Sequence, residues 1–194
     1  MAHPDFNPPG EPPKISGRSS TITGLFFNAL TPYLEPTEAE VDKALDVLGM
    51  ARSKCVCAYC GDKKSEWDHF RAIVKGRKPT GYITEIANLV PSCGKCNQSR
   101  GNKDWKSWML GTAKQSPKSR RVPDLETKVQ RLEAFEVWSK PVKIDYAALA
   151  GDEAWAKHLR HLDQILGLLK EAEEHAKELR SSAKAFAKRP RADA

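Results

Sequence analysis

Two Cys-x-x-Cys pairs constrain the fold of this chain more than any other feature of its sequence. Cys57 and Cys60 form the first pair, Cys93 and Cys96 form the second, and 32 residues separate them. Two thiolates at this spacing can hold one tetrahedral ion at about 2.3 Å each, and four thiolates complete its coordination shell. We therefore predict that the four cysteines bind a structural zinc ion, which helps to fold a segment that is poor in apolar residues.

Cys55 lies outside both pairs and is the odd cysteine of five. It could compete with Cys57 as a ligand, but Cys57 has the Cys-x-x-Cys spacing, so we interpret Cys55 as a strand residue. The N-terminus lacks the apolar segment of a secretory signal, and we expect the chain in the cytoplasm. In such a reducing compartment, paired cysteines indicate a metal site, with buried free thiols or a redox dithiol as the alternative.

The positive charge of the chain is concentrated in the same region. Residues 51–121 hold 16 Lys and Arg against 5 Asp and Glu, whereas residues 1–50 are net negative and residues 122–194 are neutral. A concentrated basic segment attracts polyanions, of which nucleic acid is the commonest, although a solvated basic face is the alternative. No apolar run approaches the roughly 18 residues of a membrane helix, so we expect no membrane partner.

The pattern of apolar and polar residues predicts an α+β chain with four parts. We expect residues 1–20, rich in proline, to be a disordered or extended arm, and residues 21–51 to be a helical segment. Residues 52–111 would form the core that carries the motifs, and residues 112–194 would form a helical C-terminal region.

Several local signals place the ends and faces of these helices. Thr37 and Glu40 form a capping box, Asp124 is expected to cap a later helix, and Trp105 and Trp108 are expected in the core.

The last segment, from about Asp152 to Lys188, carries a continuous apolar stripe. Its members are spaced alternately by four and three residues: His158, Leu162, Ile165, Leu169, Ala172, Ala176, Leu179, Ala183 and Phe186. This spacing is typical of a heptad repeat. The stripe predicts either a face packed on the rest of the chain or a surface that pairs with a second copy.

The segment between the two cysteine pairs contains residues that could carry chemistry. Glu66-Trp67-Asp68-His69-Phe70 alternates polar and apolar side chains, as a short strand does. Asp68 and His69 would therefore point to opposite faces, and taken alone such a pair is more often structural than catalytic. The second cysteine pair is preceded by Asn88-Leu89-Val90-Pro91 and followed by Asn97 and then Arg100-Gly101-Asn102.

Taken in order, these motifs resemble those of HNH endonucleases of the ββα-metal class. The resemblance rests on C-x-x-C-G, then W-D-H, then N-L-V-P-S-C-x-x-C-N-x-x-R-G-N, and it covers roughly residues 55–105. It implies a zinc-bound ββα-metal finger, and the residue patterns outside it predict that several α-helices surround it, with a long C-terminal helix. It also implies metal-dependent hydrolysis of DNA phosphodiester bonds to 5′-phosphate and 3′-hydroxyl ends.

The resemblance further implies a role for each matching residue. His69 would be the general base, and Asn88 would hold the loop and help to orient it. Asp68 and Asn97 would be the protein ligands of a catalytic Mg²⁺, with Mn²⁺ as an alternative. Asn97 stands where the residue that names the family is histidine, and its amide oxygen suits such a hard cation.

Basic residues near these motifs are expected to contact the DNA backbone. They are Arg100, Lys103, Lys75, Arg77, Lys78, Arg120 and Arg121. Each phosphate contact carries little sequence information and makes binding sensitive to salt. The implied substrate is double-stranded DNA, and the C-terminal helical region could serve dimerisation or DNA recognition.

The sequence leaves the biological role open. By analogy we favour a restriction-type enzyme of bacterial or phage origin that cuts both strands of a palindrome as a homodimer. A non-specific toxin or phage nuclease is one alternative. A non-catalytic, zinc-stabilised module that only binds nucleic acid is another, although such a module has no need of Asp68, His69 and Asn97.

Overall fold

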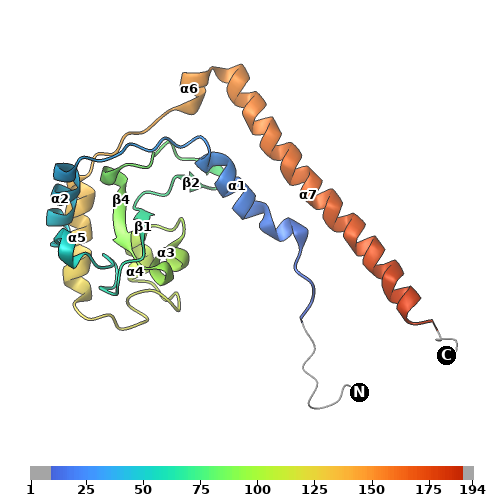
Figure 1. Ribbon diagram of the computed structural model, residues 1–194, viewed down its shortest axis with the longest axis horizontal. Coiled ribbons are helices and arrows are strands. Elements are labelled where there is room, and N and C mark those ends of the chain that lie inside the picture. The colour runs from blue at the N-terminus through green and yellow to red at the C-terminus, as the bar shows by residue number, and fades with distance from the viewer. Residues whose placement is uncertain (1–9, 190–194) are drawn as a thin grey trace, which may run out of the picture. The chain divides into compact units, whose positions relative to one another are not determined.

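The computed structural model describes residues 10–189, and the chain divides into two compact units. One unit holds residues 27–149, and the other joins the N-terminal residues up to Phe26 to the C-terminal residues from Ala150. Figure 1 labels most of the helices and strands of both units. Within residues 10–189, no helix is both long and apolar enough to cross a membrane.

Helices and short strands are interspersed in the unit of residues 27–149. Its helices are α2 (Glu38–Val47), α3 (Gly94–Arg100), α4 (Trp105–Met109), α5 (Leu125–Trp138) and most of α6 (Tyr146–Ala150), with the 3-10 turns η2 (Arg52–Lys54) and η3 (Ile86–Asn88). Its strands are β1 (Glu66–His69), β2 (Val74–Lys75), β3 (Lys78–Pro79) and β4 (Leu89–Ser92). The mixture of helices and strands confirms the predicted α+β class.

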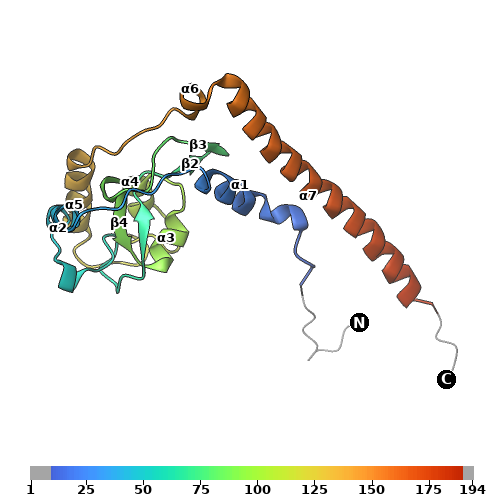
Figure 2. The same cartoon turned by 45° about the horizontal axis from the view of Figure 1, so that its top comes forward.

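The antiparallel pair β1 and β4, followed directly by α3, carries the sequence motifs. In its register Glu66 lies opposite Ser92, and His69 lies opposite Leu89. Because side chains alternate along a strand, Glu66 and Asp68 share one face of β1 and His69 takes the other. β1, β4 and α3 lie together in both Figure 1 and Figure 2, and they form the predicted ββα arrangement. β2 and β3 make a separate small hairpin.

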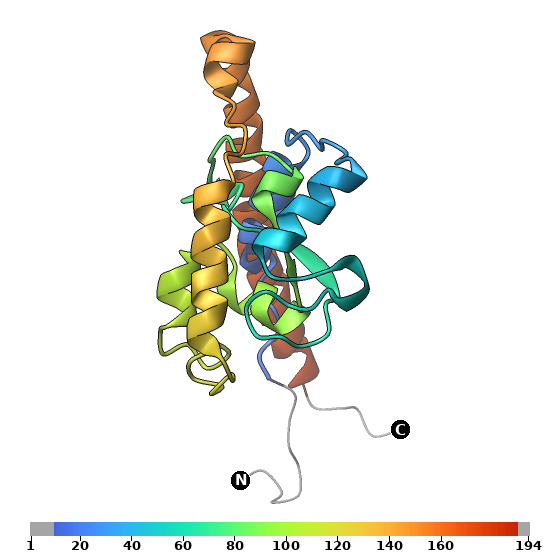
Figure 3. The ribbon, with the colours of Figure 1, turned by 90° about the vertical axis from the view of Figure 1, so that its left-hand side faces the viewer.

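An apolar core holds the ββα element against the surrounding helices. The ring of Phe70, which follows β1, lies 5.5 Å from that of Trp105 on α4 and 5.3 Å from that of Phe135 on α5. Figure 3 shows α2 and α5 side by side, and Leu132 of α5 is fully buried. Trp105 and Trp108 are both buried, which confirms their predicted place in the core. Each large side chain buried in this way stabilises the fold by roughly 1.5–3 kcal/mol.

The helix-capping signals in the sequence have different outcomes in α2 and α5. Thr37 accepts a hydrogen bond from the Glu40 N–H and the Glu40 carboxylate accepts one from the Thr37 N–H, so the predicted capping box is confirmed. Asp124 does precede α5, but its side chain makes no capping bond. Its backbone has a φ of 51°, whereas a capping residue needs an extended backbone to turn its side chain toward the helix.

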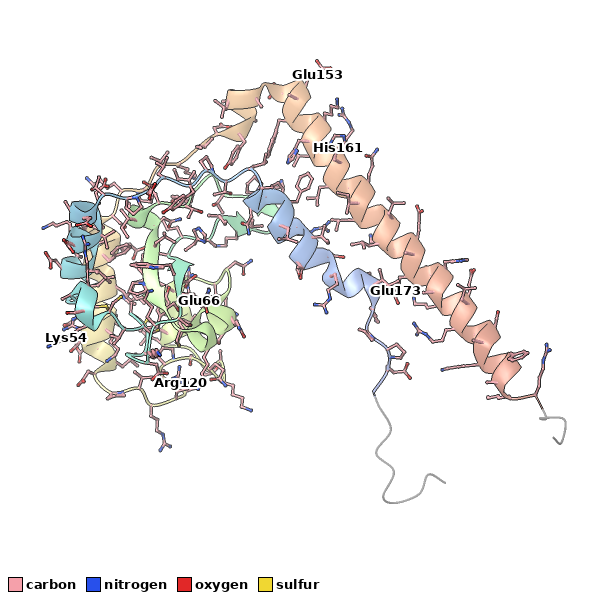
Figure 4. The ribbon with its side chains drawn as sticks, viewed as in Figure 1. Lys54, Glu66, Arg120, Glu153, His161 and Glu173 are labelled. Carbon is pink, nitrogen blue, oxygen red and sulfur yellow. The ribbon has the colours of Figure 1, made fainter. Side chains whose placement is uncertain are left out.

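The second unit is built on α7 (Asp152–Ala187), with η1 (Ile15–Arg18) packed on it and followed by α1 (Ser19–Asn28). The Ser16 N–H donates to the Glu173 carboxylate at 3.2 Å, and Figure 4 labels Glu173 on α7. The predicted arm of residues 1–20 needs correction, because residues 15–20 are helical, while residues 1–9 lie outside the described range. This segment contacts α7, which lies far away in the sequence.

The apolar stripe of α7 is used only in part. Leu162 and Leu166 are buried, at 4% and 5% exposure, although Leu166 was not part of the predicted stripe. Ile165, Leu179 and Phe186 belong to the stripe and are 38%, 58% and 69% exposed. The two buried leucines are four residues apart, as expected where one helix packs on a short neighbouring segment. The apolar residues of the stripe toward its C-terminal end, Leu179 and Phe186, are exposed.

Candidate functional site

Four buried thiols converge where the two Cys-x-x-Cys pairs meet. The Sγ atoms of Cys57, Cys60, Cys93 and Cys96 all lie within 4.8 Å of one another, and those of Cys60 and Cys93 are 3.7 Å apart. Four thiolates at about 2.3 Å from one tetrahedral ion would lie about 3.8 Å apart, so the cluster has the size and donor set of a zinc site. Hydrogen bonding to Cys60 and Cys96 lowers the pKa of Cys57 to about 4, whereas bonding to Cys57 and Cys60 raises the pKa of Cys96.

The two cysteine pairs reach the cluster from different elements. The first pair lies in a tight turn, in which the Gly61 N–H donates to the Cys57 carbonyl at 2.8 Å and Gly61 adopts a φ of 81° that glycine tolerates well. The Ala58 N–H donates to the carbonyl of Pro91, which ties this turn to β4. In the second pair, Cys93 is the N-cap of α3 and Cys96 lies in its first turn. The cluster therefore fixes the start of α3 against the turn.

His69 ends β1, and its imidazole is half-buried. Its Nε2 lies 2.8 Å from the hydroxyl Oγ1 of Thr84. Burial lowers the pKa of His69 below its ordinary value, and the positive charge of Arg100 lowers it further. The ring is therefore neutral near physiological pH, the state in which one of its nitrogens can accept a proton. In the part of the chain that the structure describes, Nδ1 of this ring has no hydrogen-bond partner.

Asn88 is fully buried and fastens the loop that follows β1. Its Oδ1 accepts from the Arg71 N–H, and its Nδ2 donates to the carbonyls of Arg71 and Ile83. Its own carbonyl accepts from the Phe70 N–H. Asn88 thus holds the backbone immediately after His69, and the side chain that contacts the imidazole is that of Thr84.

Asp68 points to the opposite face of β1 and is only 4% exposed. Arg100 donates from Nη1 to both of its carboxylate oxygens, at 2.9 and 2.7 Å, and the Tyr59 hydroxyl donates to Oδ2 at 2.7 Å. Burial raises the pKa of Asp68, and the charge of Arg100 opposes that rise. Arg100 also donates to the carbonyls of His69 and Phe70 and is 2% exposed. Contrary to the prediction, Arg100 is a buried partner of Asp68 and is not available to a DNA phosphate.

Asn97 lies on α3 and has a different carboxylate partner. Its Nδ2 donates to Oε2 of Glu66 at 2.8 Å. Glu66 precedes Asp68 by two residues on the same face of β1, and Figure 4 labels it beside α3. The two residues predicted to share a cation are therefore bonded separately, Asp68 to Arg100 and Asn97 to Glu66.

Comparison with known proteins agrees with this geometry. The HNH endonuclease family model matches residues 57–103, which include both cysteine pairs, His69, Asn88 and Asn97. Residues 57–103 form an HNH endonuclease domain. A CRISPR-associated endonuclease Cas9 of Corynebacterium diphtheriae is 38% identical over 66 residues, which are 32% of this chain and 6% of that protein. No solved structure matches the chain.

Three exposed basic residues of the HNH domain lie on its β2–β3 hairpin. Lys75, Arg77 and Lys78 are all exposed, and Arg77 lies in the turn with a φ of 62°. Lys75 and Lys103 line one shallow cleft of about 180 Å³. Nζ of Lys103 also donates to the Ser99 carbonyl at 2.8 Å, at the end of α3. The three hairpin side chains are therefore exposed to solvent, as a contact with a phosphate backbone would require.

Arg120, which follows the HNH domain, lies beside the cysteine cluster. Its Nη2 donates to Oδ2 of Asp62 at 2.7 Å, and its Nη1 lies 3.5 Å from Sγ of Cys96. Figure 4 labels its side chain below the strands. A guanidinium in this place offsets the negative charge of four thiolates and is already engaged, unlike the exposed Arg121 that follows it. Arg120 is thus bonded beside the cysteine cluster, and its contact with DNA stays a prediction.

The sequence did not single out three residues of this site, namely Tyr59, Glu66 and Thr84. Glu66 could have been found, since strand alternation places it on the face of Asp68. Tyr59 and Thr84 depend on contacts that cross the loop, and no local pattern marks them. Cys55 lies outside the cluster, in agreement with the choice of Cys57 as the ligand, but it belongs to no strand, contrary to its prediction.

Proposed function

We propose that this chain is a metal-dependent endonuclease that hydrolyses DNA phosphodiester bonds with His69 as the general base. The observation that carries the proposal is the state of the imidazole, which is held through Nε2 and leaves Nδ1 for a water molecule. Its lowered pKa keeps it neutral and able to accept a proton. A module that only binds nucleic acid has no use for a ring prepared in this way.

The proposed reaction begins with a water molecule hydrogen-bonded to Nδ1 of His69. The ring takes a proton from this water while the water oxygen forms a bond to phosphorus. The bond from phosphorus to the 3′ oxygen then breaks, the leaving oxygen takes a proton from solvent, and the products carry 5′-phosphate and 3′-hydroxyl ends. General-base catalysis of this kind contributes roughly 10²- to 10⁴-fold to a rate. Asn88 supports the step by fixing the backbone after His69.

We also propose that Asn97 is a protein ligand of a catalytic Mg²⁺, or of Mn²⁺ in its place. A bound divalent cation supplies charge neutralisation at the phosphate and at the leaving oxygen. Asn97 fits this role, since its Nδ2 donates to Glu66 and its amide oxygen is left for a hard cation. Asp68 does not fit in the described arrangement, because it is buried and bonded by Arg100 and Tyr59. The proton transfer to His69 does not depend on this ligand set.

For the cysteine cluster we propose zinc, and for the substrate double-stranded DNA. The excess of basic residues between 51 and 121 and the exposed Lys75, Arg77 and Lys78 support a DNA substrate. We propose restriction-type cleavage by a homodimer in the cytoplasm of a bacterium or of a cell infected by a phage. The exposed apolar side chains of Leu179 and Phe186 on α7 are the surface we assign to the second copy.

Incubation of the purified chain with plasmid and phage DNA, in Mg²⁺ or Mn²⁺, tests the proposed function. We expect discrete fragments with wild-type protein and with His161→Ala, an exposed histidine of α7, and no cleavage with His69→Ala. A smear that is lost in His69→Ala would contradict restriction-type specificity and favour a non-specific nuclease. If the protein binds these DNAs and cuts none of them, the proposed enzymatic function would be contradicted and a binding module would be favoured.

A further inference from the structure

Thr84 provides the side chain that contacts the His69 ring in the described part of the chain. Its Oγ1 lies 2.8 Å from Nε2, and it stands in the loop between β3 and η3, 15 residues after His69. A hydroxyl can donate or accept, so this distance alone is compatible with either neutral form of the imidazole. The direction of the bond decides which ring nitrogen remains able to take a proton.

The backbone of Thr84 is held by a segment that precedes the HNH domain. The Thr84 N–H donates to the Pro32 carbonyl at 3.0 Å, and the Leu34 N–H donates to the Thr84 carbonyl at 2.9 Å. Tyr33 and Thr84 form a parallel bridge between these two bonds. Both backbone groups of Thr84 are therefore fixed by residues 32–34, which lie outside the matched range 57–103.

We propose that Thr84 is a positioning residue of the nuclease and that Pro32–Leu34 hold it in place. In this arrangement Nε2–H of His69 donates to Oγ1 of Thr84, and the lone pair of Nδ1 faces the attacking water. The proposal rests on the proposed role of His69 as the general base. It makes a segment outside the HNH domain necessary for an ordered site.

The physical reason is the equilibrium between the two neutral forms of imidazole. A ring without a fixed partner exchanges its proton between Nδ1 and Nε2, and a ring with the proton on Nδ1 cannot accept a second one there. The ring also turns about its χ2 angle, which has a broad energy profile. When the Thr84 hydroxyl acts as the acceptor, as we propose, it removes both freedoms, because it holds the proton on Nε2 and fixes the plane of the ring.

Nitrogen NMR of the His69 ring tests the hydrogen bond without any cleavage assay. In the zinc-loaded chain near neutral pH we expect the proton on Nε2 and a single tautomer. In Thr84→Val, which keeps the shape and removes the hydroxyl, we expect both tautomers, and Thr84→Ser should restore one. A wild-type ring protonated on Nδ1, or spectra that are identical in wild type and Thr84→Val, would overturn the proposal. Failure of the chain to cut DNA would leave this readout unaffected, so the two failures are distinguishable.

Steady-state cleavage separates positioning from stability. Thr84→Val should lower kcat by roughly 10- to 100-fold, a part of what a general base contributes, with KM, zinc content and melting temperature unchanged. Thr84→Ser should recover most of the rate. A change in KM alone, or a loss of rate that Thr84→Ser shares in full, would contradict a positioning role.

The backbone hydrogen bonds that hold Thr84 can be weakened without a change to its hydroxyl. Leu34→Pro removes the N–H that donates to the Thr84 carbonyl, whereas Tyr33→Ala changes an exposed side chain and leaves the backbone bonds in place. We expect the His69 tautomers to mix in Leu34→Pro and to stay single in Tyr33→Ala. A single tautomer in both variants would refute the part of the proposal that concerns residues 32–34.

Discussion

Nη1 of Arg100 lies 2.9 and 2.7 Å from the two carboxylate oxygens of Asp68, and both side chains are buried. A buried ion pair adds little over apolar packing, but removal of one partner leaves an uncompensated charge that costs about 3–5 kcal/mol. We therefore expect Arg100→Met to lower the free energy of unfolding by about that amount. Urea unfolding of the zinc-loaded chain measures it. Lys103→Met, at an exposed neighbouring position, should stay within about 0.5 kcal/mol, and equal stability of Arg100→Met and wild type would contradict the buried pair.

Metal removal should unfold the HNH domain, because the cysteine cluster replaces a larger apolar core around α3. We expect a chelator, or Cys60→Ser, to abolish bound zinc and to lower the helix signal in circular dichroism. Cys55→Ser is the matched control, since Cys55 is near in sequence and outside the cluster. Loss of zinc in Cys55→Ser, or its full retention in Cys60→Ser, would show that the ligands are assigned incorrectly.

Arg120 should increase the affinity of the cysteine cluster for zinc. A partner of this kind contributes about 10- to 100-fold to metal affinity when it supports a ligand. We expect Arg120→Ala to weaken zinc binding within that range, because it removes the hydrogen bond to Cys96. Competition with a coloured chelator gives the affinity, and Arg121→Ala, at the next and exposed position, should leave it unchanged. Equal affinities of the two variants would argue for a role of Arg120 elsewhere.

The hairpin lysines should contribute to DNA binding through phosphates alone. Each phosphate that a protein neutralises makes the slope of log K against log salt steeper by about 0.9. We expect Lys75→Ala with Lys78→Ala to weaken binding of all DNA sequences alike and to make the slope less steep by about 0.9 for each phosphate that is no longer bound. Binding titrations at several salt concentrations measure the slope. Lys43→Ala, which changes an exposed lysine of α2, serves as the control. A loss of affinity confined to one DNA sequence would mean that the hairpin recognises bases.

The packing of α1 on α7 should weaken in acid. His158 stacks on Phe26 with ring centres 4.2 Å apart, and burial lowers the pKa of this histidine from 6.5, with a further contribution from His161. A lowered pKa means that the open state binds protons more readily, so stability is present above the ordinary pKa and is lost as pH falls below it. Hydrogen exchange of α1, corrected for its intrinsic rate, should therefore accelerate between about pH 7.5 and 5.5. His158→Phe should remove this acceleration, and an unchanged acceleration in that variant would locate its cause in another group.

Features that depend on local spacing were predictable from the sequence. The four cysteines could be grouped because a turn of two residues brings two thiols to one ion, whatever the rest of the fold. β1 was predictable because its polar and apolar residues alternate, and α2 because Thr37 and Glu40 satisfy each other's backbone. The match of residues 57–103 confirms the family to which these motifs pointed.

Features that depend on distant partners were not predictable. In the sequence, Arg100 resembles an exposed basic residue among other basic residues. Only the fold shows that it is buried against the carboxylate of Asp68. Residues 15–18 are helical and lie against α7, and no pattern in a proline-rich segment reveals that contact. The apolar stripe of α7 likewise did not predict which of its residues are buried, because a heptad spacing does not indicate how long the partner segment is.

Cys96 directly precedes Asn97, and both belong to the helix that begins at Cys93. An ion bound by the cysteines would therefore also set where the amide of Asn97 comes to lie relative to β1. If the chain cuts DNA as proposed, we expect it to be inactive until it has acquired this ion, because before then the residues of the site are not held in fixed positions relative to one another. The supply of one metal would thereby time the onset of an activity that depends on another.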